Sequence, residues 1–227
     1  MPGPASDAVQ STRVVLRPVA SPFPLGFSAL ATASLLVAGA ELGWLSSSSD
    51  RLVVALVLIG FAFPLQLLSS IFGFLSRDSS AATSFGVQAA TWLVVGLARL
   101  LTAPGSTSHA VGMLLCAASA WVALCALGSA LGKLVPAGVL SLVSLRFLLT
   151  GLYQLTASRG VEHAAGIVGL VLVAACGYTI LAMEVEGLEH RTVLPLFRHG
   201  PGREAMSERF AEQSERARHE PGVREQL

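Results

Sequence analysis

Six long apolar stretches, separated by short polar or charged breaks, occupy most of the chain. A helix needs about 20 apolar residues to cross roughly 30 Å of hydrocarbon, and each stretch meets or nearly meets that length. None of them contains more than one charged residue. The stretches are Leu25–Leu45, Leu52–Leu75, Thr83–Leu101, Ala110–Leu131, Leu134–Ala157 and Ala164–Val185.

Inside a bilayer every backbone N–H and C=O must find a partner within the protein, so segments of this kind must be helices. The breaks between them are short, which favours antiparallel neighbours. The pattern therefore predicts an all-α membrane protein in which six transmembrane helices form one bundle within residues 21–198. A cytoplasmic N-terminal arm (residues 1–20) is expected before the bundle and a polar, flexible cytoplasmic tail (residues 199–227) after it.

Composition supports the lipid bilayer as the partner of this chain. Only 13% of the residues are charged, against about 25% in an ordinary soluble domain. There is no basic stripe of the kind that binds nucleic acid. No nucleophile–base arrangement, HExxH, GxSxG or phosphate-binding Gly loop is present, so an enzyme is not expected. The three cysteines lie inside apolar stretches without zinc-site spacing, so neither a metal nor a cofactor is expected.

The distribution of basic residues predicts the orientation in the membrane. Lys and Arg near the ends of spans are kept in the cytoplasm, and six spans place both termini on the same side. That side collects Arg13, Arg17, Arg77, Lys133, Arg191, Arg198 and Arg203, and the opposite side collects Arg51, Arg99 and Arg159. We therefore expect a multi-pass protein of the cytoplasmic (inner) membrane with both termini in the cytoplasm.

The strongest chemical signal is Arg146, near the middle of the fifth stretch. An Arg at that depth costs about 2.5–3.5 kcal/mol on insertion scales, so it must face water, an anion or an acidic partner. Thr150 and Tyr153 follow at helical spacing on the same face. Two interpretations stay open: these residues line a path that carries an anion, or Arg146 forms a structural ion pair with Glu41.

Further polar residues lie in the second and third stretches. Gln66 follows Pro64, which removes an interior hydrogen bond and predicts a kink. Gln88, Thr91 and Arg99 lie on nearly one face of the next span. Gln66, Gln88 and Thr91 are candidates for lining a path, although they could also only tie helices together.

Four short motifs resemble the acetate uptake transporter family, whose members include bacterial succinate–acetate permeases. They occur in that family's order and spacing, from residue 21 to residue 195. Ser21–Phe27 (SPFPLGF) resembles its Asn-Pro-x-Pro-Leu-Gly-Leu signature, and Ser84–Gly86 (SFG) resembles its Thr-Phe-Gly. The other two are His163–Gly166 with Gly169 and Tyr178, and His190–Pro195 (HRTVLP).

The resemblance implies a six-helix protomer with a central path, assembled as a homo-oligomer such as a hexamer, that moves acetate and related small carboxylates. It also implies which residues lie near that path. The proline-rich signature contributes Pro22, Pro24, Leu25 and Gly26, and the positions of family aromatic residues fall at Leu30 and Leu93. The sixth-span pattern adds Tyr178.

We therefore expect a membrane permease or channel for small carboxylates such as acetate or succinate, moving alone or with a proton. One alternative keeps the path but changes the cargo to a small neutral solute such as urea, ammonia or water. Another is a non-transporting membrane scaffold or regulator that works through the charged tail.

Overall fold

The computed structural model describes residues 20–189, 191–200 and 203, so nearly all of the predicted arm and of the predicted tail lies outside the described residues. Within the described part, six helical segments are long and apolar enough to cross a membrane by length and composition. They are Phe23–Glu41, Ser48–Leu75, Ser79–Leu101, His109–Ala130, Leu134–Thr156 and Arg159–Glu189. The all-α fold with six spans is thereby confirmed, and the chain is a multi-pass membrane protein.

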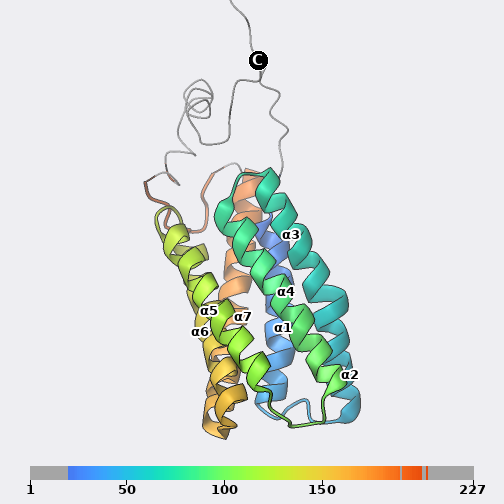
Figure 1. The fold of residues 1–227 in the computed structure, drawn as a ribbon. Helices are drawn as coiled ribbons and strands as arrows, with labels where there is room; N and C mark the ends of the chain where they lie inside the picture. Colours follow the sequence, from blue (N-terminus) through green and yellow to red (C-terminus); the bar gives the residue numbers. More distant parts are fainter. Residues whose placement is uncertain (1–19, 190, 201–202, 204–227) are drawn as a thin grey trace, which may run out of the picture.

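The helices lie side by side in one bundle (Figure 1). The most extensive contacts are between α5 and α6, between α1 and α7, and between α3 and α4. The elements are α1 (Phe23–Glu41), α2 (Ser48–Val57), the π-helical turn η1 (Leu58–Ala62), α3 (Phe63–Leu75), α4 (Ser79–Leu101), α5 (His109–Ala130), α6 (Leu134–Thr156) and α7 (Arg159–Glu189).

The second span is interrupted where the sequence predicts a kink. Pro64 lies at the start of α3, directly after the π-helical turn η1. Phe63 N–H donates to Leu58 O, five residues back. Proline has no N–H to give to the ordinary helical ladder and its ring crowds the preceding turn. A widened turn ahead of it accommodates the ring, as π-bulges do elsewhere.

Glycines set the closest helix approaches at some positions of the bundle and end a helix at others. Gly151 of α6 faces α5, where an added Cβ would lie 2.9 Å from Cys116 Sγ and 3.1 Å from Gly112 O. Gly43, in contrast, lies beyond the end of α1 in a turn with φ +78°, and nothing lies within 4 Å of an added Cβ. The first span is therefore shorter than predicted, because the chain turns at Gly43 after α1 ends at Glu41.

The chain after α7 turns back and completes the start of α6. Leu134 N–H donates to Phe197 O and Val135 N–H donates to Leu196 O, each at 3.4 Å. These are first-turn donors that an α-helix cannot satisfy internally, and the preceding Lys133 makes no side-chain cap. Leu196 is fully buried, so this segment belongs to the folded bundle.

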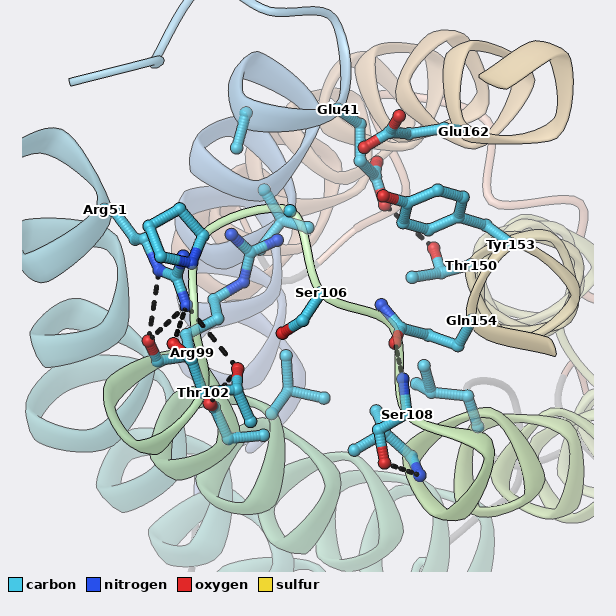
Figure 2. A pocket seen from close by; sticks show the side chains of 18 of the residues that line it. Glu41, Arg51, Arg99, Thr102, Ser106, Ser108, Thr150, Tyr153, Gln154 and Glu162 are labelled. Carbon is cyan, nitrogen blue, oxygen red and sulfur yellow. Dashed lines mark hydrogen bonds between the residues drawn. The ribbon is translucent and has the colours of Figure 1, made fainter. Parts of the chain in front are cut away.

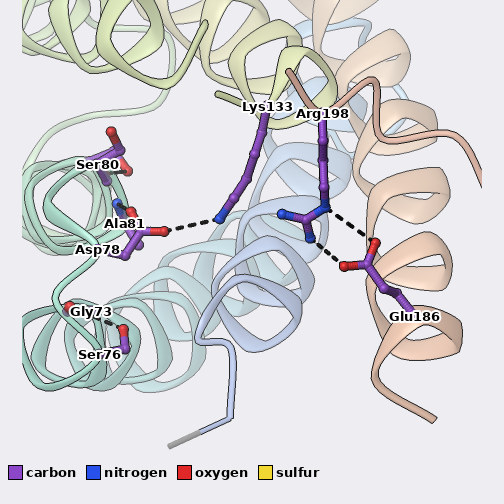
Figure 3. Close-up of polar contacts among 9 residues, drawn as sticks. Gly73, Ser76, Asp78, Ser80, Ala81, Lys133, Glu186 and Arg198 are labelled. Carbon is purple, nitrogen blue, oxygen red and sulfur yellow. Dashed lines mark hydrogen bonds and ion pairs between the residues drawn. The ribbon is translucent and has the colours of Figure 1, made fainter. Parts of the chain in front are cut away.

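Two ion pairs hold this end of the bundle together (Figure 3). Lys133 contacts Asp78 at 3.4 Å and lies over the ring of Phe23. Arg198 pairs with Glu186 of α7. Because the four charges come from distant parts of the chain, they fix the α3–α4 turn, the start of α6 and the segment after α7 relative to one another.

Between the two ends the bundle is packed with aromatic rings. Phe23, Phe27 and Phe85 form a cluster with ring centroids 5.3–5.7 Å apart. Gly26 lies directly against the Phe85 ring. All of these side chains are buried, and so is the neighbouring Leu30. The protomer is therefore densely filled with side chains between the proline-rich start of α1 and the middle of the bundle.

Candidate functional site

A cavity of about 350 Å³ opens at the end of the bundle where α1, α4 and α6 end and where α2, α5 and α7 begin. We call it the vestibule (Figure 2). Its charged lining residues are Arg51, Arg99, Arg146, Arg159, Glu41 and Glu162. Four arginines against two glutamates leave a formal excess of two positive charges. The vestibule is thus a hollow of positive charge in an otherwise apolar bundle.

Glu41 and Arg146 form a buried ion pair in the vestibule wall. Arg146 Nη2 donates to Glu41 Oε2 at 3.1 Å, and the two side chains are only 1% and 3% exposed. Thr150 donates to the other carboxylate oxygen at 2.9 Å. Arg146 Nη1 donates to Ala165 O at 3.0 Å. Both oxygens of the carboxylate and both terminal nitrogens of the guanidinium are therefore engaged within the protein.

Small residues on α7 make this pair possible. Gly169 lies so close to Arg146 Nη1 that an added Cβ would overlap it. Ala165, one turn earlier, supplies the accepting carbonyl. Ala165 and Gly169 thus make room for a guanidinium, in addition to bringing α7 against α1.

Arg51 and Arg99 have different environments. Arg51 donates to Arg99 O and to Thr102 O, carbonyl groups at the end of α4 that the helix leaves unsatisfied. The Arg99 guanidinium makes no hydrogen bond or ion pair to any residue that the structure describes, and Figure 2 shows its side chain extending into the vestibule. Arg51 therefore stabilises the end of α4 in the vestibule wall, and Arg99 remains able to bind a ligand.

The rim of the vestibule is tied down on its other side. Gln154 of α6 accepts a hydrogen bond from Ser108 N at 2.9 Å, and Ser108 caps the start of α5 by accepting from Val111 N. Arg159 pairs with Glu162 at 2.9 Å. The loop between α4 and α5 is thus fixed at both ends, which keeps the opening in place.

The floor of the vestibule is apolar and aromatic. Val37, Trp92, Leu115 and Phe147 line it and are almost completely buried. Trp92 and Phe147 meet edge to face at 5.4 Å. The buried Trp92 Nε1–H has no hydrogen-bond partner within the described residues. Since buried polar groups are nearly always partnered, an acceptor for this N–H is expected from outside the described residues.

The structure brings some of the predicted residues together and leaves others apart. Arg146, Thr150 and Tyr153 line the vestibule, together with Glu41. Gln66 and Gln88 lie deeper in the bundle: Gln66 Nε2 donates to Gln88 Oε1 at 3.2 Å and to Gly26 O at 3.4 Å. The Gln66 Oε1 atom has no partner among the described residues. These two amides form a second polar position, separate from the vestibule.

The remaining predicted residues do not line the vestibule. Pro22, Leu30 and Thr91 are buried, Pro24 and Leu93 are half-buried, and Leu25 is exposed. Thr91 donates to Val87 O of its own helix. Tyr178 is exposed on α7, and its hydroxyl donates to Pro195 O at 2.8 Å. A role for these residues in a path stays a prediction.

From the sequence, Arg99 is placed on the face of Gln88 and Thr91 but is treated as a residue of the span end, where a basic side chain usually reaches the headgroups. Trp92 is not singled out there. The sequence does contain one signal for a shared site: Trp92 and Arg99 are seven residues apart, and this spacing places two side chains on one helix face. An Arg and a Trp two turns apart on one span indicate a shared polar environment, but not whether it faces lipid or a cavity.

The fold is known from a solved structure. The bacterial acetate channel SatP superposes with a TM-score of 0.69 and 18% sequence identity, covering 79% of this chain and 99% of that one. No protein-family model matches the sequence, and no curated protein is similar to it by sequence. The likeness therefore identifies the arrangement of the helices.

Proposed function

We propose that this protein is a permease or channel for small carboxylates such as acetate, and a member of the acetate uptake transporter family. The fold of an acetate channel and the four sequence motifs support membership. The observation that carries the function is the vestibule, where four arginines outnumber two glutamates and the Arg99 guanidinium has no partner among the described residues. A hollow of positive charge at the mouth of a bundle suits an anionic substrate.

The vestibule would collect anions before they enter the bundle. Clefts lined by one sign of charge focus the electric field between low-dielectric walls and raise the local concentration of the opposite ion. A carboxylate that enters would exchange part of its hydration shell for hydrogen bonds from Arg99 and from hydroxyl groups such as that of Tyr153. This lowers the cost of moving the anion towards the hydrocarbon region.

Passage beyond the vestibule requires the aromatic packing to move. Phe27, Leu30 and Phe85 fill the region below it, so this structure corresponds to a shut conformation of the proposed path. The next polar position is formed by Gln66 and Gln88. We propose that displacement of the Phe85 ring, which lies on α4 beyond Gln88 as counted from the vestibule, opens the path from these amides towards the other end of the bundle.

The proposed setting is the cytoplasmic membrane. The excess of basic residues at the other end of the bundle favours both termini in the cytoplasm, which places the vestibule on the outer side. Large apolar side chains on α5, including Met113, Trp121 and Leu127, are exposed. In a bilayer such a face contacts lipid or a neighbouring protomer, consistent with a homo-oligomer such as a hexamer.

A channel for a small neutral solute is the second candidate. It is favoured by the deeper polar position, where two neutral amides meet and Gln66 Oε1, which no described residue engages, can accept a hydrogen bond from a solute. In that case the vestibule arginines would stabilise the fold and would not bind the substrate.

Uptake into proteoliposomes tests the proposal. Purified protein in vesicles should take up labelled acetate faster than empty vesicles, and unlabelled propionate should compete. Urea and water permeability are measured in the same vesicles. Uptake of urea without uptake of acetate, propionate or succinate would favour the neutral-solute channel and contradict the proposal.

A further inference from the structure

We infer that Arg99 and Trp92 form the carboxylate-binding site of the vestibule, and that its ligand is a short-chain monocarboxylate. Arg146, which the sequence indicates as the candidate anion-binding cation, is part of the vestibule wall and does not contact the ligand. The inference rests on the proposed function, since it names the residues that would hold the substrate.

The first argument is that the other vestibule cations are occupied. Arg146 is engaged by Glu41 and Ala165 O. Arg159 is paired with Glu162, and Arg51 donates to the carbonyl groups at the end of α4.

Arg99 faces the same cavity without a hydrogen bond or ion pair to any described residue. Glu41 is the acidic side chain whose charge acts on it. Both oxygens of Glu41 already accept hydrogen bonds from Arg146 and Thr150. The planar fork of Arg99 is therefore available to bind a carboxylate with two parallel hydrogen bonds.

The second argument is the unpartnered donor on the same helix face. Trp92 lines the vestibule, is 2% exposed, and has an Nε1–H without a partner within the described part of the chain. Arg99 is seven residues later, so the two Cα atoms are separated by about 10.5 Å along the axis of α4. Because helical side chains lean towards the N-terminus, the Arg99 side chain shortens that gap. The Nε1 atom itself is covered in this structure, so a small anion held by Arg99 would satisfy both donors once the indole turns towards it.

The third argument concerns the size and charge of the ligand. Val37, Leu115 and Phe147 line the floor beside Trp92 and offer no hydrogen-bonding side chain. A methyl or ethyl group can lie there, while a second carboxylate would lose hydration without gaining a cation. One guanidinium that no described residue engages, above an apolar floor, fits acetate or propionate better than succinate.

The indole N–H signals provide a direct test. The chain has three tryptophans, and two of them, Trp44 and Trp121, are more than half exposed and lie outside the vestibule lining. The ¹⁵N-labelled full-length protein in lipid nanodiscs is titrated with acetate at constant ionic strength, and the Trp92 signal is assigned by its loss in Trp92→Phe. Acetate should shift the Trp92 signal in a saturable way and leave the other two in place.

Substitutions then identify the cation. Arg99→Gln should weaken acetate binding at least about tenfold, and Arg99→Lys should retain part of it. Arg191→Gln removes one positive charge from an exposed pair outside the vestibule and serves as the matched control. The Trp44 and Trp121 signals report whether each variant is folded. Succinate should bind at least about tenfold more weakly than acetate.

Three results would overturn the inference: no shift of Trp92 with acetate, the same apparent affinity in Arg99→Gln, or an equal response to chloride. Equal affinity for succinate would overturn the monocarboxylate assignment. The outcome is independent of transport: a Trp92 shift in a protein without acetate flux would refute the proposed function and leave the site. Acetate flux without a shift of the Trp92 signal would support the proposed function and refute the binding site.

Discussion

Arg146 and Glu41 are 105 positions apart in the chain and meet at 3.1 Å inside the bundle, shielded almost completely from solvent. Arg146 also donates to Ala165 O, so one side chain of α6 contacts both α1 and α7. A buried cation of this kind is tolerated because each of its terminal nitrogens has an acceptor. The pair thus connects three helices at the wall of the vestibule.

Removing only one partner of this pair should destabilise the protein strongly. Arg146→Gln leaves the Glu41 carboxylate buried without its cation, and breaking such a pair typically costs about 3–5 kcal/mol. The measurement is the free energy of unfolding in mixed micelles, followed by far-UV circular dichroism. The double variant Glu41→Leu/Arg146→Met should recover most of the loss. A single variant as stable as the wild type would show that the pair does not form in the membrane.

Gly169→Ala tests the space that α7 leaves for the guanidinium. The added methyl group would overlap Arg146 Nη1, so the variant should lose about 1–3 kcal/mol of stability, as overpacked sites do. Gly177→Ala, on the same helix, is the matched control because nothing lies within 4 Å of its added Cβ. Thermal unfolding by size-exclusion fluorescence measures both. Equal midpoints for the two variants would contradict the close approach.

Phe85→Leu tests the proposed obstruction below the vestibule. A smaller side chain beside Phe23 and Phe27 leaves part of the ring volume empty, so acetate flux should rise several-fold while the fold persists. The control is Phe74→Leu, since Phe74 is exposed on the outer surface of α3. Flux is measured by acetate uptake into vesicles at matched protein density. Unchanged or reduced flux in Phe85→Leu would indicate that the path does not pass this ring.

Glu186→Gln tests the attachment of the segment after α7. Glu186 pairs with Arg198 and accepts a hydrogen bond from Thr192, and a hydrogen bond to a charged group contributes about 1.5–3 kcal/mol. Trypsin should therefore cleave after Arg198 about tenfold faster in the variant. Glu189→Gln is the control because its pair with Arg191 is exposed and worth little. Equal cleavage rates would show that the segment is held by other contacts.

The spans could be predicted from the sequence because hydropathy and length depend on composition alone. Their ends could not be predicted as well. The first span ends at Glu41, before the predicted Leu45, because Gly43 adopts a positive φ. The last helix extends well beyond Ala164–Val185 at both ends, since polar residues outside the hydrocarbon can continue a helix that hydropathy does not detect.

The site was only partly predictable for a different reason. A single Arg in the middle of a span stands out because inserting its charge into the hydrocarbon is unfavourable. Arg146 and its candidate partner Glu41 could therefore be selected from the sequence. Arg99 lies at a span end, where a basic residue costs little, and its position in the cavity depends on how α1 and α6 pack against α4. Such tertiary information is not contained in the periodicity of one helix.

The central claim is that carboxylates pass through the vestibule, and a blocking experiment tests it most directly. Ser106→Cys places a thiol in its lining, and Ser49→Cys places one on the same end of the bundle outside the lining. Acetate uptake into vesicles is measured before and after a charged, membrane-impermeant thiosulfonate reagent, with the wild type as control for the native cysteines. Modification should abolish most uptake in Ser106→Cys only. Full uptake in quantitatively modified Ser106→Cys would contradict the account.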